Sequence, residues 1–315
     1  TPERLGIDYD SLSGHKSDII IMDLTAFEGP MPGPWGTLKG FDPVLQAATG
    51  IQSRYGGADN KPVLHGVASC IDYLTGYSGV FGTALALFRR TKNGQGDLVK
   101  TSLAQGGQLI QIPFMFTYPE QTDATEAQGQ ETLGTSPLNH IYETSDGYVF
   151  LAGLPDEIQK LTSNIHFPEL NTELSSNIDA IDSIGRSIKQ HSTHFWVNEI
   201  NDLGLGCHKI DTLEEIREKY THQVGATPSN EDWNDGRTIS IGRMNEHPVG
   251  SSVDNIAPAY AIFQNAEIKM GPPMPKLGSN TLDILTELGY SPEKIDSLLK
   301  NGSARKQFHN KYLPG

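Results

Sequence analysis

The chain has 315 residues, 37% of them hydrophobic and 20% charged, which is typical of a soluble globular protein with one large or two modest lobes. Its formal net charge of −14 disfavours a general affinity for nucleic acid or anionic membrane, because those partners require a basic surface. Cys70 and Cys207 are too few for a disulfide framework, and we find neither a signal peptide nor an apolar run of membrane-spanning length. These features favour a cytoplasmic enzyme or binding protein.

The first half of the chain predicts strands that alternate with helices, and therefore an α/β fold. The expected elements are a short helix at 2–12, a strand at 18–24, a helix at 41–50, a long helix from 67 to the basic residues near 92, a strand at 98–101 and a helix at 103–116. Loops are expected at 29–40, 51–66 and 118–137, and the last of these is long enough to form a lid.

The long helix is the main feature of this half. Ala, Gly, Ser and Thr recur from Ala68 to Ala86, so that other backbone or a ligand can approach closely, while residues such as Phe81 and Phe88 supply apolar bulk. We therefore expect the helix to be buried, with Asp72 near its N-terminal end.

Asp72 has two interpretations from the local sequence alone. Aspartate is a common helix N-cap, which is the more frequent case. A carboxylate beside small residues can also attack an activated acyl group. His65 and Cys70 lie close to Asp72 in sequence, but their spacing matches no zinc-ligand pattern, and a single Cys on an Ala-rich face is usually a packing residue. We predict no metal site.

Lys39 is the basic residue with the most suggestive position. It lies in a Gly-rich loop immediately before a predicted helix, where orphan N–H groups favour a phosphate. Arg89 and Arg90 follow the long helix and are better explained by compensation of its C-terminal dipole.

The second half predicts a separate lobe that begins with a turn and strand at 146–152. The expected helices lie at 155–164, 174–190, 194–203, 212–220, 281–288 and 292–300, with a loop at 221–240. Thr212 and Glu215 have the spacing of a capping box. The predicted division is a large domain at 1–140, a small domain at 141–250 and a C-terminal segment at 251–315 that returns to the large domain.

Several separated segments resemble the class III CoA-transferases, the CaiB/BaiF-like family that includes formyl-CoA transferase and carnitine CoA-transferase. GFDPVLQAATG at 40–50 is similar to the family's GFD-x-x-x-Q-x-x-x-G helix, and IDYLTGYSGVFGTALAL at 71–87 to its catalytic-aspartate helix. GQG and VKTSL are similar to the following turn and strand. Segments at 145–153, 203–216 and 272–290 continue the resemblance in the family's order.

The resemblance implies a Rossmann-like large domain, incomplete at its N-terminus, with a smaller α+β domain. It implies that Asp72 is the nucleophile, which forms an aspartyl mixed anhydride and then an aspartyl-CoA thioester. The positions that match the family's CoA-binding residues are Arg4, Leu38, Lys39, Gly40 and Phe41. Asp42 matches an acidic position beside the site, on the possible substrate side.

The implied activity is a transfer of CoA from an acyl-CoA to a small carboxylic acid, with coenzyme A as part of the substrate. The implied assembly is a homodimer, or a complex with a partner that supplies the missing N-terminal part. Alternatives are a non-catalytic CoA-binding subunit, a fragment of a fused two-repeat protein, or an acyl-CoA racemase or CoA-dependent lyase. Related racemases use a His at the position of Phe41, whose phenyl ring cannot exchange a proton, so two-base racemisation is disfavoured.

Overall fold

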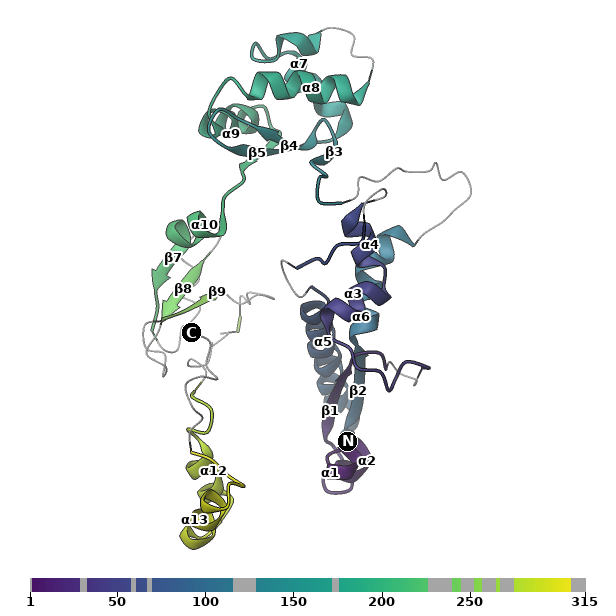
Figure 1. Ribbon diagram of the computed structural model, residues 1–315, viewed down its shortest axis with the longest axis vertical. Coiled ribbons are helices and arrows are strands. Elements are labelled where there is room, and N and C mark those ends of the chain that lie inside the picture. Colours follow the sequence, from purple (N-terminus) through teal and green to yellow (C-terminus); the bar gives the residue numbers. More distant parts are fainter. Residues whose placement is uncertain are drawn as a thin grey trace. The chain divides into compact units, whose positions relative to one another are not determined.

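We describe a computed structural model of the chain (Figure 1). The residues that it describes are 2–28, 33–57, 61–66, 70–115, 129–171, 176–225, 240–244, 252–256, 265–266 and 275–306. The chain divides into two compact units, Thr1–Lys209 and Ile210–Gly315, each of which is treated by itself below. The division into domains at residues 140 and 250 stays a prediction.

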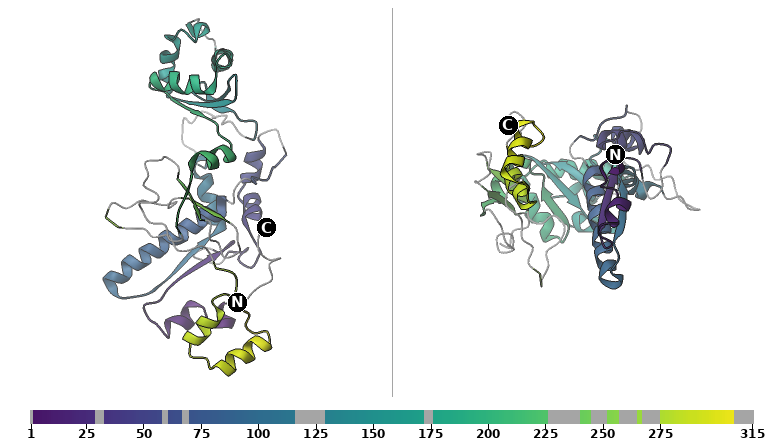
Figure 2. Two further views of the ribbon diagram at one scale, coloured as in Figure 1. Left: turned by 90° about the vertical axis from the view of Figure 1, so that its left-hand side faces the viewer. Right: turned by 90° about the horizontal axis from the view of Figure 1, so that it is seen from below.

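The first unit contains a strand–helix–strand arrangement that confirms the α/β class. Strands β1 (Ile20–Thr25) and β2 (Asp97–Ser102) pair in parallel, with Ile20 opposite Asp97 and Thr25 opposite Ser102. Helix α5 (Cys70–Asn93) is the last element of the connection between them and runs along both strands (Figure 2). A tight turn reverses the direction of the chain and can join only antiparallel strands. Two parallel strands therefore require a longer crossover connection.

Shorter helices complete this lobe. They are α1 (Pro2–Leu5), α2 (Tyr9–Ser13), α3 (Asp42–Ala48), α4 (Ile51–Gly56), α6 (Leu103–Gln111) and the 3₁₀ turn η1 (Ile112–Phe114). The core of the lobe is formed by Leu45, Ile51, Ile71 and Leu103, which come from α3 to α6.

Two local predictions for this lobe are wrong. The expected helix at 2–12 is divided into α1 and α2, because Gly6 adopts a left-handed φ of 65° and Asp8 then caps α2 through the Ser11 amide. The expected loop at 51–66 begins with helix α4 instead. Gly50, with φ of 82°, reverses the chain after α3, and Ile51 is then buried in the core.

Small residues allow close packing around α5, as the sequence predicts. A Cβ atom added at Gly82 would lie 2.7 Å from Val99 Cγ1 of β2. A Cβ atom at Gly106 of α6 would collide with the Thr75 hydroxyl, which itself donates to the Ile71 carbonyl at 2.7 Å. The backbone of α5 at Gly82 therefore lies against a side chain of β2, and the backbone of α6 at Gly106 lies against a side chain of α5.

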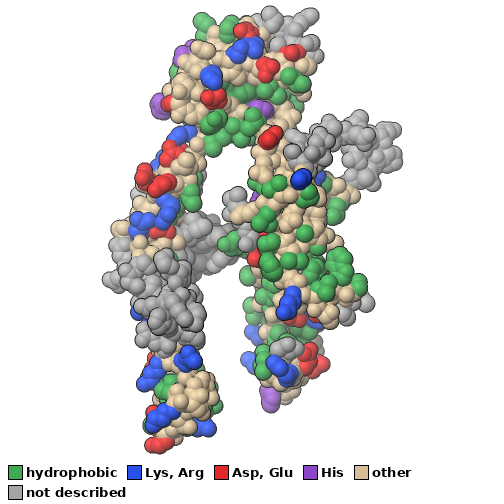
Figure 3. Space-filling model, viewed as in Figure 1, with side chains coloured by type: hydrophobic (Ala, Val, Ile, Leu, Met, Phe, Trp, Pro, Cys, Tyr) green, Lys and Arg blue, Asp and Glu red, His purple; other side chains and the backbone are tan. Residues whose placement is uncertain are grey.

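Helix α5 is only partly buried, which corrects the prediction that it is a buried helix. Its exposed apolar side chains are Tyr73, Tyr77, Val80, Phe81, Leu85, Leu87 and Phe88. Val80 and Phe81 are 64% and 66% exposed. Apolar side chains are plainly visible on the surface of this lobe in Figure 3. The sheet and α6 cover one side of a helix that is apolar on nearly all sides.

The rest of the first unit is an antiparallel sheet covered by helices. The sheet order is β3 (Gly134–Ser136), β4 (Asn139–Glu143), β5 (Tyr148–Ala152) and β6 (Gly206–Lys209). The helical elements are η2 (Pro155–Ile158), α7 (Gln159–Thr162), η3 (Pro168–Asn171), α8 (Asn177–Ile188) and α9 (Thr193–Asp202). Trp196 and Phe167 are fully buried at the centre of its core.

The second unit contains a three-stranded sheet and three helices among its described residues. These elements are α10 (Leu213–Tyr220), β7 (Thr221–Gln223), β8 (Ile241–Met244), β9 (Val253–Ile256), α12 (Thr281–Glu287) and α13 (Pro292–Lys300). The predicted capping box is confirmed, because Thr212 Oγ1 accepts from the Glu215 amide and Glu215 Oε2 accepts from the Thr212 amide. Strand β7 lies within the expected loop at 221–240, most of which is outside the described residues.

No helix in the described parts of the chain combines the length and the hydropathy needed to cross a membrane. The expected lid at 118–137 also falls largely outside the described residues, and β3 occupies its end.

The substitution Gly106→Ala should destabilise the first unit by about 1–3 kcal/mol, because the new methyl group overlaps the Thr75 hydroxyl in a packed helix contact. The matched control is Gly76→Ala in α5, where an added Cβ meets nothing within 4 Å. It should stabilise the protein by about 0.5–1 kcal/mol, because glycine is entropically costly inside a helix. Urea unfolding followed by circular dichroism measures both, and equal effects of the two substitutions would contradict the packing argument.

Candidate active site

The N-terminal end of α5 is held by a carboxylate from another helix. Asp42, the first residue of α3, is only 3% exposed. Its Oδ2 atom accepts hydrogen bonds from the amides of Ile71 at 2.9 Å and Asp72 at 3.3 Å. These amides belong to the first turn, where backbone N–H groups have no partner within the helix. Asp42 therefore acts as a cap supplied from 29 and 30 residues earlier in the chain.

Gln46 holds the Asp42 carboxylate in this position. It lies one turn later on α3, is 1% exposed, and donates from Nε2 to Asp42 Oδ1. The same amide group binds the backbone of His65, donating to its carbonyl at 3.0 Å and accepting from its N–H at 3.1 Å. We refer to Asp42, Gln46 and the His65 backbone as the cap network. It fixes α3, the segment before α5, and the start of α5 relative to one another.

Asp72 is the third residue of α5, so the interpretation of Asp72 as an N-cap residue is wrong. Its side chain is exposed, and none of the described residues donates a hydrogen bond to its carboxylate. Partial desolvation raises the pKa of Asp72 above its ordinary value, and the nearby negative charge of Asp42 raises it further. The result is a more basic and accessible carboxylate on a fixed helix end.

The loop before α3 places four of the predicted CoA-binding residues beside the cap network. Leu38, Lys39 and Phe41 are exposed, and Phe41 is the N-cap residue of α3, adjacent to Asp42. Gly40 has a packing role, because a Cβ atom there would lie 2.7 Å from Ala26 Cβ and 2.9 Å from Leu45 Cδ2. Glycine thus allows the loop to press onto the end of β1 and onto α3.

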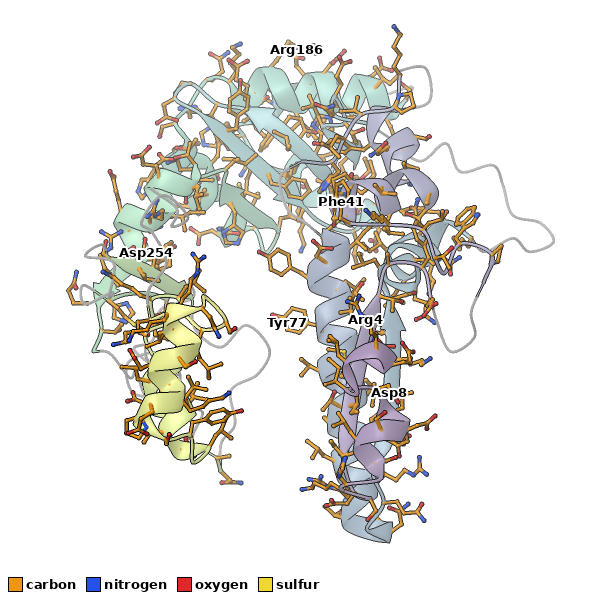
Figure 4. The ribbon with its side chains drawn as sticks, turned by 60° about the horizontal axis from the view of Figure 1, so that its bottom comes forward. Arg4, Asp8, Phe41, Tyr77, Arg186 and Asp254 are labelled. Atoms are coloured by element: carbon orange, nitrogen blue, oxygen red, sulfur yellow. The ribbon has the colours of Figure 1, made fainter. Side chains whose placement is uncertain are left out.

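Arg4 is not brought to this group of residues. It lies on α1, before the chain enters β1, whereas Phe41 follows the exit from β1. Figure 4 shows the two side chains well apart. A ligand that contacts both must be extended.

His65 and Cys70 do not form a thiol–imidazole pair or a metal centre. Burial raises the pKa of the Cys70 thiol, and the charge of Asp42 adds to this, so the thiolate that a nucleophilic cysteine requires is disfavoured. The described part of the chain contains no group of three or more His, Cys, Asp or Glu side chains arranged to hold a metal ion.

The sequence analysis missed Gln46 and the His65 backbone as parts of the site. The i, i+4 spacing of Asp42 and Gln46 on a predicted helix is a visible signal that their side chains meet. Nothing in the local sequence indicates the bonds to the His65 backbone, because they depend on how the loop after α4 returns to α3.

Replacement of Asp42 by Asn should lower the pKa of Asp72. The substitution removes the neighbouring negative charge and keeps an oxygen that can accept from the Ile71 N–H, although the new NH₂ group then faces Gln46 Nε2 and that hydrogen bond is lost. A ¹³C NMR titration of labelled aspartate carboxyls, with the Asp72 signal assigned from Asp72→Asn, measures the shift. The control Asp10→Asn, on α2, should leave the Asp72 titration unchanged, and an unchanged or higher pKa in Asp42→Asn would contradict the electrostatic argument.

Comparison with known proteins identifies the family of the chain. The family described as CoA-transferase family III matches residues 1–281 of the chain. The CoA-transferase/lyase DddD of Marinomonas sp. (strain MWYL1) is 28% identical over 310 residues, which cover 98% of this chain. The beta subunit of succinyl-CoA–L-malate CoA-transferase from Chloroflexus aurantiacus (strain ATCC 29366 / DSM 635 / J-10-fl) is 24% identical over 95% of the chain.

The matched relatives are longer than this chain, which spans 36% of DddD and 73% of the malate CoA-transferase beta subunit. A CaiB/BaiF family protein from Brucella suis has a similar fold, with a TM-score of 0.65 and 21% identity over 91% of this chain and 72% of its own. Because the family matches residues 1–281, most of the length of this chain, the chain belongs to CoA-transferase family III.

Proposed function

We propose that this protein transfers CoA from an acyl-CoA donor to a small carboxylic acid, with Asp72 as the covalent nucleophile. The observation that supports this most directly is the state of Asp72: an accessible carboxylate with a raised pKa, on a helix end held by the cap network. Membership of CoA-transferase family III supports the reaction class.

The proposed exchange requires only carboxylates and thiolates. The Asp72 carboxylate attacks the thioester carbonyl, and the C–S bond breaks to give a mixed anhydride and CoA thiolate. The thiolate attacks the aspartyl carbonyl, which releases the donor acid and leaves an aspartyl-CoA thioester. The acceptor carboxylate attacks this thioester to form a second anhydride and release the thiolate, which then attacks the acceptor acyl carbon and regenerates Asp72. No step has a net gain or loss of protons.

The raised pKa of Asp72 suits this chemistry. A more basic carboxylate is a better nucleophile towards the thioester carbonyl. The rigid cap network also holds the carboxylate at a fixed place, which reduces the entropic cost of the attack.

The CoA moiety is proposed to lie along the loop before α3. Lys39 offers an exposed ammonium group for a phosphate, next to Leu38 and the backbone at Gly40. CoA is an extended molecule with its thioester and its nucleotide at opposite ends. The separation of Arg4 from Phe41 therefore fits a role for Arg4 near the nucleotide end.

A CoA-dependent lyase is the second candidate, because the relative DddD is named a CoA-transferase/lyase. A lyase step would need a base to remove a proton next to the thioester carbonyl, and Phe41 cannot supply it. Product analysis in deuterated water separates the two activities, since a pure transferase leaves the α-carbon unlabelled and forms no unsaturated acyl-CoA.

The proposed setting is the cytoplasm, and the proposed assembly is a homodimer or a complex with a partner chain. The second possibility is supported by relatives that are named alpha and beta subunits of one CoA-transferase.

Covalent trapping tests the role of Asp72. After incubation with succinyl-CoA, hydroxylamine should convert Asp72 into its hydroxamate, which peptide mass spectrometry locates. Asp72→Asn should abolish both the adduct and transfer, whereas Asp10→Asn should change neither. An unmodified Asp72 after exposure to a range of acyl-CoAs would refute the transferase proposal.

Substitution of Lys39 by Gln should raise KM for the acyl-CoA by about tenfold, the cost of one charge-assisted hydrogen bond, with a smaller effect on kcat. The reason is that a phosphate far from the reacting carbon is bound equally well in the ground and transition states. Lys92→Gln, at the far end of α5, is the control and should have no effect. A fall in kcat with KM unchanged would place Lys39 in the chemical step instead.

A further inference from the structure

Helix α5 contains three glycines, and the packing of the described residues explains only two of them. An added Cβ atom at Gly79 would lie 3.1 Å from Met22 Sδ of β1, and one at Gly82 would lie 2.7 Å from Val99 Cγ1 of β2. At Gly76 an added Cβ atom would have no neighbour within 4 Å among the described residues. Glycine inside a helix is less stable than alanine, so a glycine in open space calls for another reason.

Gly76 lies one turn after Asp72, on the same side of the helix. Four residues of about 100° each bring the side-chain direction back to within about 40°, and the rise per residue separates the two positions by about 6 Å along the axis. The Asp72 side chain is exposed, and Gly76 is half-buried. A group bonded to the Asp72 carboxylate can therefore lie directly on the helix backbone at Gly76.

Strand β1 and helix α5 run in opposite directions. Near the end of α5, Arg90 Nη1 donates to the carbonyl of Asp18, which precedes β1, at 2.9 Å. At the other end, Asp42, which follows β1, caps the first turn of α5. The carboxyl end of β1 therefore lies beside the first turns of α5, where Asp72 is located.

Leu24 of β1 provides an apolar side chain at this level. Met22 packs at Gly79, and Leu24 points to the same face of the strand because side chains alternate. Two strand residues span about 6.6 Å, close to the rise of four helix residues, which places Leu24 about level with Gly76. Leu24 is 39% exposed, so α5 leaves part of its side chain uncovered. We refer to Gly76 and Leu24 as the acyl floor, for the reason given next.

The thioester carbonyl carbon carries two substituents, the CoA sulfur and the acyl chain. In the proposed reaction CoA lies along the loop before α3, and Phe41 of that loop adjoins Asp42 at the start of α5. The acyl chain leaves the reacting carbon on the other side, toward the next turn of α5. Figure 4 shows Phe41 near the start of α5 and Tyr77, the neighbour of Gly76, projecting from the helix further along.

We propose that Gly76 is a specificity-determining residue, which leaves room for the acyl group of the donor on the acyl floor. This inference rests on the proposed role of Asp72 as the nucleophile. The substrate class that it names is an acyl-CoA with an aliphatic acyl group larger than acetyl. In the mixed anhydride this group is bonded to Asp72 through its carbonyl carbon and makes apolar contacts with Leu24 and the Gly76 Cα atom.

The rate of Asp72 hydroxamate formation with single donors tests this inference. The probes are acetyl-CoA, butyryl-CoA and isovaleryl-CoA, each with hydroxylamine and peptide mass spectrometry, and the original protein should react with all three. In Gly76→Leu the rate with isovaleryl-CoA should fall by about tenfold or more, and that with acetyl-CoA should stay within about twofold, because a filled site rejects groups by size. The rate with butyryl-CoA should fall by an intermediate factor.

Two further variants separate size selection from a general loss of structure. Ala84→Leu adds bulk at an exposed position of α5, about two turns after Gly76, and should leave all three rates unchanged. Leu24→Ala in the Gly76→Leu background should restore part of the rate with isovaleryl-CoA, because it removes bulk from the acyl floor. Gly76→Leu should be folded by circular dichroism, since leucine is a good helix former and the position is open.

The outcomes distinguish this inference from the proposed function. If Asp72 is modified but Gly76→Leu keeps the original ratio of rates, the inference fails and the transferase proposal stands. It also fails if the original protein reacts only with acetyl-CoA. Equal slowing with acetyl-CoA and isovaleryl-CoA would place the CoA chain itself over Gly76. A smaller mass of Gly76→Leu by light scattering, with unchanged ratios, would show that a second copy covers Gly76, and either result overturns the inference. If no donor modifies Asp72 in the original protein, the proposed function fails and the inference fails with it.

Discussion

The contact on which the site depends is the pair of hydrogen bonds from the Ile71 and Asp72 amides to the buried Asp42 carboxylate. A helix begins with backbone N–H groups that need partners and with the positive end of its dipole, and a carboxylate satisfies both. Here the carboxylate belongs to α3. The position of the Asp72 backbone is therefore set by the packing of α3 as well as by α5 itself.

Asp42 also has an electrostatic effect that a neutral cap would lack. A buried carboxylate is costly unless its oxygens are hydrogen-bonded, and Gln46 with the two amides meets that requirement. Partial desolvation is the larger cause of the raised pKa of Asp72, and the charge that remains on Asp42 adds to it by disfavouring a second negative charge nearby. One residue thus fixes the place of the candidate nucleophile and increases its basicity, which is a reason for Asp rather than Ser or Asn at position 42.

Elements whose signals are local can be predicted from the sequence. The capping box at Thr212, the start of α3 with Pro43, and the strands before and after α5 all follow from short patterns. Asp72 is recognisable as a candidate nucleophile because a distributed set of family motifs surrounds it. The role of Asp42 as a cap is not predictable in this way, because the two groups are 29 and 30 residues apart and meet only after α3 has packed against α5.

The exposed side of α5 could not be predicted from the sequence, for a different reason. Apolar residues on nearly every side of a helix predict burial, but they do not say which surface covers each side. Gly79 and Gly82 select the side that packs on β1 and β2, because only there can the strands approach the helix backbone. Phe81 and Phe88 are left on the opposite side and remain exposed among the described residues. An apolar surface of this kind is characteristic of a contact with other protein. The geometry of Asp72 requires only contacts within the first unit, while the apolar face of α5 is the feature on which the proposed assembly with a second copy or a partner chain would depend.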